Sequence, residues 1–189
     1  MTKAKKGSSF ERDFSKILSL WWTQDLDEPR EDVFWRSTTS GARATTRAKK
    51  GLNTYGQYGD IAAIDPIGDP LLRFVSIECK RGYSSHSFGS LLDRPKGACA
   101  NQFKEWIAKA KRCHEASGSV SWILVVRRNR ACGLVIMPIE LAGVLHLTKS
   151  VYPAFRVELE DELLMAVTLD DFLEFVTPDI VKKLLEDHK

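Results

Sequence analysis

Residues 71–80, with the sequence LLRFVSIECK, carry the clearest strand pattern in the chain. Side chains alternate between the two faces of a strand, so the apolar odd-numbered residues from Val75 onward should face a core. Glu78 and Lys80 then share the opposite face. Burying a carboxylate and an ammonium there is costly unless they pair or bind something. Two interpretations follow, a plain ion pair at the rim of a sheet or a functional site.

A second acidic residue precedes this strand. The sequence GDIAAI begins at Gly59, and it places Asp60 at the start of a short apolar strand over residues 60–64. A turn through residues 65–70, DPIGDP, predicts a hairpin that brings Asp60 beside Glu78. Two carboxylates beside one lysine form an oxygen-rich site suited to a divalent cation such as Mg²⁺. The alternative for Asp60 is an ordinary aspartate at a strand edge.

The remaining patterns predict one α/β domain with a mixed central sheet flanked by helices. The chain of 189 residues suits a core over residues 1–140 and a small acidic appendage over residues 141–189. Beyond the two strands above, the expected helices are 10–22, 102–114, 170–175 and 179–186, and the expected strands are 33–36, 120–126, 131–137, 155–159 and 163–168.

Charge is distributed unevenly along the chain. Residues 1–130 carry 23 Lys and Arg against 14 Asp and Glu, a net charge of +9, whereas residues 131–189 carry 5 against 11, a net charge of −6. The basic portion favours an anionic partner such as nucleic acid, although an ordinary solvated surface is equally compatible with it.

Several functional classes lack support in the sequence. The four cysteines have no zinc-ligand spacing and are expected to be reduced thiols. The chain has no nucleotide-binding fingerprint, so no small-molecule cofactor is expected. It also has no apolar run long enough to cross a membrane and no signal peptide. We therefore expect a cytoplasmic protein without a membrane partner, and an origin in a phage or virus is compatible with this.

The order Asp60, Glu78, Cys79, Lys80 resembles the D…ExK signature of the PD-(D/E)XK nucleases, with Gly59 where proline is usual. More narrowly, four segments resemble archaeal-type Holliday junction resolvases. They are KGSSFER at residues 6–12, the stretch from Arg36 to Ser40-Gly41, the GDI strand that begins at Gly59, and the IECK strand. The resemblance covers residues 5–138. A long basic loop over residues 42–58 and the acidic segment after residue 140 depart from it.

The resemblance implies a restriction-endonuclease-like fold and a homodimer that hydrolyses DNA with Mg²⁺, for which Mn²⁺ can substitute. Asp60 and Glu78 would hold the metal, with Glu11 acting directly or through water, and Lys80 would act on the attacking water or the phosphate. Ser40 and Gln102 would complete the site, although Gln102 is equally compatible with an ordinary polar residue in the first turn of its helix. The expected DNA contacts are Arg36, Arg43, Arg47, Lys49, Lys50, Arg81 and Lys96. Two alternatives stay open. One is a restriction-type, repair or phage endonuclease acting on duplex or single-stranded DNA, and the other is a non-catalytic DNA-binding module of the same fold.

The basic loop generates a first prediction. Replacing Arg43, Arg47, Lys49 and Lys50 by alanine should weaken DNA binding. Each phosphate contact that is lost reduces the number of counterions that binding releases from the DNA. The slope of log K against log salt should fall by roughly two to four units. Cleavage at saturating DNA should change much less. Fluorescence anisotropy across a salt series measures the slope, and an unchanged slope would move the DNA-binding surface elsewhere.

Overall fold

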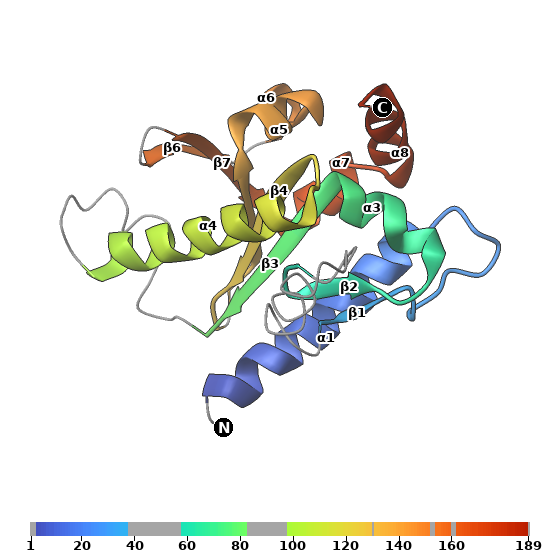
Figure 1. Ribbon diagram of the computed structural model, residues 1–189, viewed down its shortest axis with the longest axis horizontal. Helices are drawn as coiled ribbons and strands as arrows, with labels where there is room; N and C mark the ends of the chain where they lie inside the picture. Colours follow the sequence, from blue (N-terminus) through green and yellow to red (C-terminus); the bar gives the residue numbers. More distant parts are fainter. Residues whose placement is uncertain are drawn as a thin grey trace.

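The computed structural model describes residues 3–37, 58–82, 98–129, 131–151, 154–159 and 162–188, with side chains from Ser9 onward in the first helix and from Gln102 onward in the helix that begins at residue 98. It is an α/β structure with a five-stranded mixed sheet flanked by helices (Figure 1). The main sheet contains β3 (Val75–Arg81), β4 (Ser121–Arg127), β5 (Gly133–Pro138), β6 (Phe155–Leu159) and β7 (Glu162–Thr168).

The order of strands across this sheet is β3-β4-β5-β7-β6. Strands β3 and β4 are parallel, with Glu78 opposite Leu124, and the other neighbours are antiparallel. A parallel pair requires a crossover connection, and α4 (Ala98–Ser117) supplies it. The fold class predicted from the sequence is therefore confirmed.

The two faces of the sheet have separate cores. Helix α4 covers one face, where Phe103, Trp106 and Ala110 pack with Leu124 and Ile136. The larger core lies on the other face, and it is covered by α1 (Lys3–Trp22), α3 (Asp69–Phe74), α5 (Ile139–Val144), α6 (Leu147–Ser150), α7 (Leu169–Phe175) and α8 (Pro178–Asp187). As expected, the odd-numbered residues of β3 face this larger core. Glu78 faces α4 and is as buried as the apolar residues beside it.

The strand expected over residues 71–80 is shorter than predicted, because its first part is helical. Asp65 accepts a hydrogen bond from the Ile67 amide at 3.0 Å and caps the short 3₁₀ helix η1 (Pro66–Gly68), which leads into α3. Leu71 and Phe74 are both buried in the larger core. They would point to opposite faces of a strand, whereas a helix directs both toward one side. The first part of the apolar run, up to Phe74, is therefore helical, and the strand begins at Val75.

The hairpin expected between the Asp60 strand and the Glu78 strand is wrong. Strand β2 (Ile61–Ala63) pairs antiparallel with β1 (Phe34–Arg36) in a separate two-stranded sheet. Helices η1 and α3 occupy the segment that was expected to turn directly between the two strands. Asp60 nevertheless reaches β3, because its amide donates to the Ile77 carbonyl at 2.8 Å.

Both long helices start earlier than their apolar patterns indicate. Helix α1 begins at Lys3 rather than Phe10. Helix α4 begins at Ala98 rather than Gln102, in a stretch whose alanines favour helix. Near the C-terminus, the Thr177 side chain accepts a hydrogen bond from the Ile180 amide and caps α8.

The acidic segment after residue 140, predicted as a small strand and helix appendage, contributes β6 and β7 to the main sheet. Strand β7 pairs with β5 and β6 pairs with β7, and Val181 of α8 lies in the larger core together with Phe10 of α1. Residues after 140 therefore complete the sheet and the layer that covers it. Within the described parts of the chain, no helix has the length and apolar character that crossing a membrane requires.

Gly59 generates a prediction about stability. Its φ is +103°, and a Cβ at this position would lie 2.7 Å from the Ile77 carbonyl oxygen. Gly59→Ala should lower the free energy of unfolding by about 2 kcal/mol or more, because it combines backbone strain with a clash against backbone. The matched control is Gly143→Ala, in helix α5, where a Cβ meets nothing within 4 Å. Urea denaturation compares the two variants, and equal stabilities would contradict the close approach at Gly59.

Candidate active site

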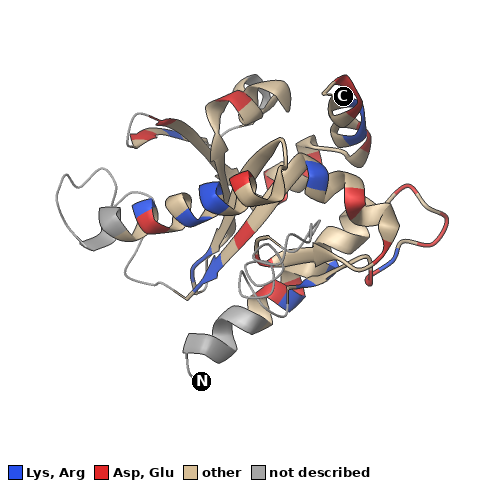
Figure 2. Ribbon diagram, viewed as in Figure 1, with Lys and Arg blue, Asp and Glu red and all other residues tan. Residues whose placement is uncertain are grey.

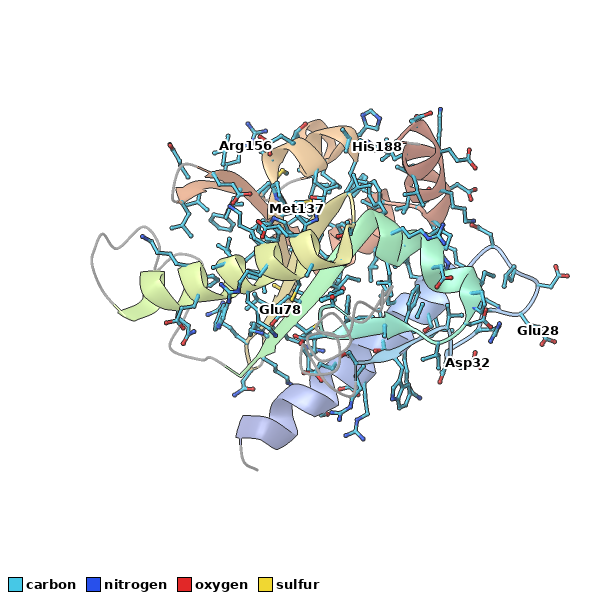
Figure 3. The ribbon with its side chains drawn as sticks, viewed as in Figure 1. Glu28, Asp32, Glu78, Met137, Arg156 and His188 are labelled. Atoms are coloured by element: carbon cyan, nitrogen blue, oxygen red, sulfur yellow. The ribbon has the colours of Figure 1, made fainter. Side chains whose placement is uncertain are left out.

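Asp60 and Glu78 come together at the outer edge of β3, although Asp60 directly precedes β2 of the small sheet and Glu78 lies in the main sheet. The Asp60 amide donates to the Ile77 carbonyl, and its Oδ2 accepts from the Cys79 amide at 2.8 Å. Asp60 therefore occupies the edge of β3 that β4 leaves open. Glu78 lies on β3 on the side of α4 (Figure 3), and its side chain is fully buried. The Asp60 side chain is 7% exposed.

Two lysines contact this carboxylate pair. The Lys80 ammonium binds Glu78 Oε1, lies 3.7 Å from Asp60 Oδ2, and donates to the Cys79 carbonyl at 3.2 Å. The Lys109 ammonium, from α4, binds the same Glu78 oxygen and lies 3.3 Å from Asp60 Oδ1. The two acids and two lysines balance in formal charge. The structure thus brings together Asp60, Glu78 and Lys80 as the sequence predicts, and it adds Lys109.

The electrostatics of the pair reflect burial. Burial, followed by the charge of Asp60, raises the pKa of Glu78 above its ordinary value of 4.5, and the two lysines offset this only in part. Burial also acts to lower the pKa of Lys109, but Asp60 and Glu78 outweigh burial and raise it, so this lysine stays protonated. On the opposite side of β3, burial raises the pKa of the Cys79 thiol, which remains an apolar core group.

The oxygen atoms at this site fit a divalent cation. Two carboxylates and the Cys79 carbonyl converge on the Lys80 ammonium, so a cation already lies among hard oxygen ligands. Glu78 Oε2 is buried and has no hydrogen-bond partner. A buried anionic oxygen left unpaired is costly, and a cation would satisfy it. Among the described residues, no group of three or more acidic, histidine or cysteine side chains is arranged to hold a metal.

Glu11 lies at the rim rather than among these ligands. Its Oε2 is 3.8 Å from Arg36 Nη1, and its side chain is 22% exposed. Burial and then the charge of Asp60 raise the pKa of Glu11, which indicates that the two acids lie near each other. Arg81, at the end of β3, lies 3.7 Å from Asp13 of α1. Figure 2 shows Lys and Arg at this end of β3 and both signs of charge along α4.

Gln102, a further predicted site residue, forms its hydrogen bond away from Asp60 and Glu78. Gln102 donates to Glu105 at 2.9 Å on the exposed side of α4, two helical turns before Lys109. Its predicted role in the site stays a prediction. Six further predicted residues lie outside the described part of the chain: Ser40, Arg43, Arg47, Lys49, Lys50 and Lys96.

Lys109 is the site residue that the sequence did not reveal. It directly precedes Ala110 and follows Trp106 by three positions, so it borders the apolar stripe of α4. A lysine in that position usually extends its stem along apolar surface and places its ammonium in water. Only the register of α4 against β3 turns this ammonium toward two carboxylates, and no local pattern specifies that register.

The raised pKa of Glu78 generates a prediction for the metal-free protein. An acid whose pKa is higher in the folded state binds its proton more tightly there, so the folded state loses stability as pH rises from about the ordinary value of 4.5 through the raised pKa. Above that interval the full cost remains. Glu78→Gln removes this titration, so its melting temperature relative to wild type should increase with pH and then level off. Thermal melts in EDTA measure the difference, and a decrease with rising pH would contradict the predicted effect of burial.

A comparison with known protein families identifies the chain. The model of the family described as "Phage putative PDDEXK endonuclease" matches residues 2–183, which is nearly the full length. No curated protein and no solved structure gives a significant match. The matched region contains Asp60, Glu78 and Lys80, which the sequence alone assigned to the D…ExK signature. The chain therefore belongs to this phage family of PD-(D/E)XK endonucleases.

Proposed function

We propose that this chain is a divalent-cation-dependent endonuclease that hydrolyses phosphodiester bonds in DNA, with Mg²⁺ as the expected cation and Mn²⁺ as a substitute. The main support is the convergence of Asp60 and Glu78, from separate segments, beside Lys80. A pair needed only for stability would use one acid and one base. A second buried carboxylate adds repulsion and desolvation cost, which is expected where the carboxylates bind a cation.

The residues of the site would have distinct roles in the reaction. Asp60, Glu78 and the Cys79 carbonyl would hold the cation, and Glu11 would contribute through water. A bound divalent cation lowers the pKa of a coordinated water and offsets charge on the phosphate. Lys80, held by the same oxygens, would orient the attacking water or neutralise the charge that develops on the phosphate. Arg36, beside Glu11, would contact the DNA backbone at the rim.

The finer proposal concerns the substrate. The resemblance of the KGSSFER segment and of the stretch from Arg36 to Ser40-Gly41 to Holliday junction resolvases implies a homodimer that cuts branched DNA, such as a four-way junction. Two-fold symmetry would provide one site for each of two strands. The family description names a phage endonuclease and no DNA geometry. The alternative raised from the sequence, an endonuclease acting on duplex or single-stranded DNA, therefore stays open. We place the protein in the cytoplasm of the cell in which it acts, because that is where it would meet its DNA.

Cleavage assays test this proposal directly. EDTA should abolish cleavage, Mg²⁺ or Mn²⁺ should restore it, and Ca²⁺ should support binding without turnover. Asp60→Asn, Glu78→Gln and Lys80→Met should each lower turnover by about a hundredfold or more, because each removes a group that stabilises the transition state. DNA affinity should fall far less, since phosphate contacts elsewhere supply most of it. Glu11→Ala should have a similar or weaker effect.

A matched control and a substrate panel complete the experiment. Glu162→Gln removes an acid that pairs with Lys111 at 2.6 Å, away from Asp60 and Glu78, and should cleave at the wild-type rate. A four-way junction, a flap, a duplex and a single strand, compared at equal concentrations, rank the candidate substrates. Cleavage by wild type in EDTA, or by Glu78→Gln at the wild-type rate, would refute the proposed chemistry. Binding without any cleavage would instead support a non-catalytic DNA-binding module.

A further inference from the structure

Lys109 reaches the carboxylate pair from a different layer of the fold. Its ammonium binds Glu78 Oε1 and lies 3.3 Å from Asp60 Oδ1, so it bridges the two acids. Lys80 also binds Glu78 Oε1 but approaches Asp60 through Oδ2, at 3.7 Å. The two ammonium groups therefore contact Asp60 through different oxygens. Both ammonium groups thus lie where a cation could contact both acids, and Lys109 lies closer to Asp60 than Lys80 does.

Charge balance makes the two lysines and a divalent cation alternatives. Asp60 and Glu78 bring two negative charges into a site where Glu78 is fully buried, and Lys80 and Lys109 neutralise them. A divalent cation brings two positive charges by itself. With both lysines still in place, the site would then carry an excess charge of +2 at low solvent exposure, where repulsion between like charges is strong. At least one ammonium must give way.

Lys109 is the lysine that can leave. Its side chain is 36% exposed, compared with 15% for Lys80. Lys80 is part of β3 and also donates to the Cys79 carbonyl, which holds it against the strand. Lys109 is attached to a helix at the edge of the site, and its flexible stem with a compact charge lets the ammonium turn outward. In that position it would face the solvent side of the carboxylates, from which an anionic ligand must approach.

We propose that Lys109 occupies the place of the divalent cation in the metal-free protein and, once the cation binds, turns outward to contact a DNA phosphate. The inference rests on the proposed nuclease function. Lys109 would thus couple cation binding to DNA binding. Before the cation arrives, the ammonium competes with it for Asp60 and Glu78. Afterwards, the same charge becomes available to the backbone of the substrate, as a contact additional to those predicted from the sequence.

The first test measures cation binding without DNA. Calorimetric titration of Lys109→Met with Mg²⁺, and separately with Ca²⁺, should give a dissociation constant about tenfold lower than that of wild type, because the competing ammonium is gone. The matched control is Lys111→Met, which removes the same charge from the same helix but from the pair with Glu162. Its dissociation constant should equal that of wild type. Unchanged or weaker cation binding by Lys109→Met would overturn the proposal.

The second test measures DNA binding at saturating Ca²⁺, by fluorescence anisotropy with a labelled junction and a labelled duplex. Lys109→Met should bind both several-fold more weakly than Lys111→Met, because Lys109, unlike Lys111, would contact a phosphate near the site. Equal losses of DNA affinity in the two variants would overturn the proposed contact between Lys109 and a phosphate. Lys109→Arg keeps the charge and should restore DNA affinity to near the wild-type value.

Loss of Lys109 leaves two buried acids with one lysine, so the variant could unfold without a cation. Thermal melts address this, because Mg²⁺ should raise the melting temperature of Lys109→Met by more than that of wild type. An equal rise in melting temperature in both proteins would contradict the proposed competition between Lys109 and the cation. The wild-type cleavage assay distinguishes a failure of the role proposed for Lys109 from a failure of the proposed nuclease function. If wild type cuts DNA while Lys109→Met binds the cation no more tightly, only the role of Lys109 fails. If wild type neither binds the cation nor cuts, both proposals fail.

Discussion

The site depends on the docking of Asp60 onto the edge of β3. Two hydrogen bonds of 2.8 Å join them, from the Asp60 amide to the Ile77 carbonyl and from the Cys79 amide to Asp60 Oδ2. The same residue thereby fixes its backbone and its carboxylate against the strand that carries Glu78. The small sheet of β1 and β2 follows from this contact, because β2 starts at the next residue. An error in this docking would separate the two acids even with both sheets intact.

Burying the Glu78 carboxylate is electrostatically unfavourable, and positively charged side chains from two layers of the fold offset this cost. Glu78 interrupts a row of apolar residues that runs across the sheet through Leu124 and Ile136. Water would solvate this carboxylate at an exposed position, but beneath α4 the charge requires a nearby positive group. Lys80 supplies part of that charge from the strand, and Lys109 supplies the rest from the helix. Sheet and helix are therefore coupled through ionised groups as well as through apolar packing.

Local patterns predicted the strands of the sheet and the shared face of Glu78 and Lys80 on β3, because alternation between faces places these two residues without knowledge of any other element. They failed where several structures satisfy one pattern. The run from Leu71 to Phe74 is apolar enough for a strand or a short helix, and packing against the larger core decided for the helix. The proximity of Asp60 to Glu78 was predicted, although through a hairpin that does not form. Lys109 required the register of α4, which only tertiary packing determines.

The glycine before Asp60 also bears on how such sites are recognised in sequences. A φ of +103° is outside the range of proline, whose ring holds φ near −65°, so this backbone excludes the residue that gives the PD-(D/E)XK name its first letter. Gly59 permits the chain to approach β3 closely enough for both hydrogen bonds of Asp60. Where that approach is retained, glycine and proline at this position correspond to two different backbone routes to one carboxylate. A search pattern that requires proline would pass over chains that follow the route seen here.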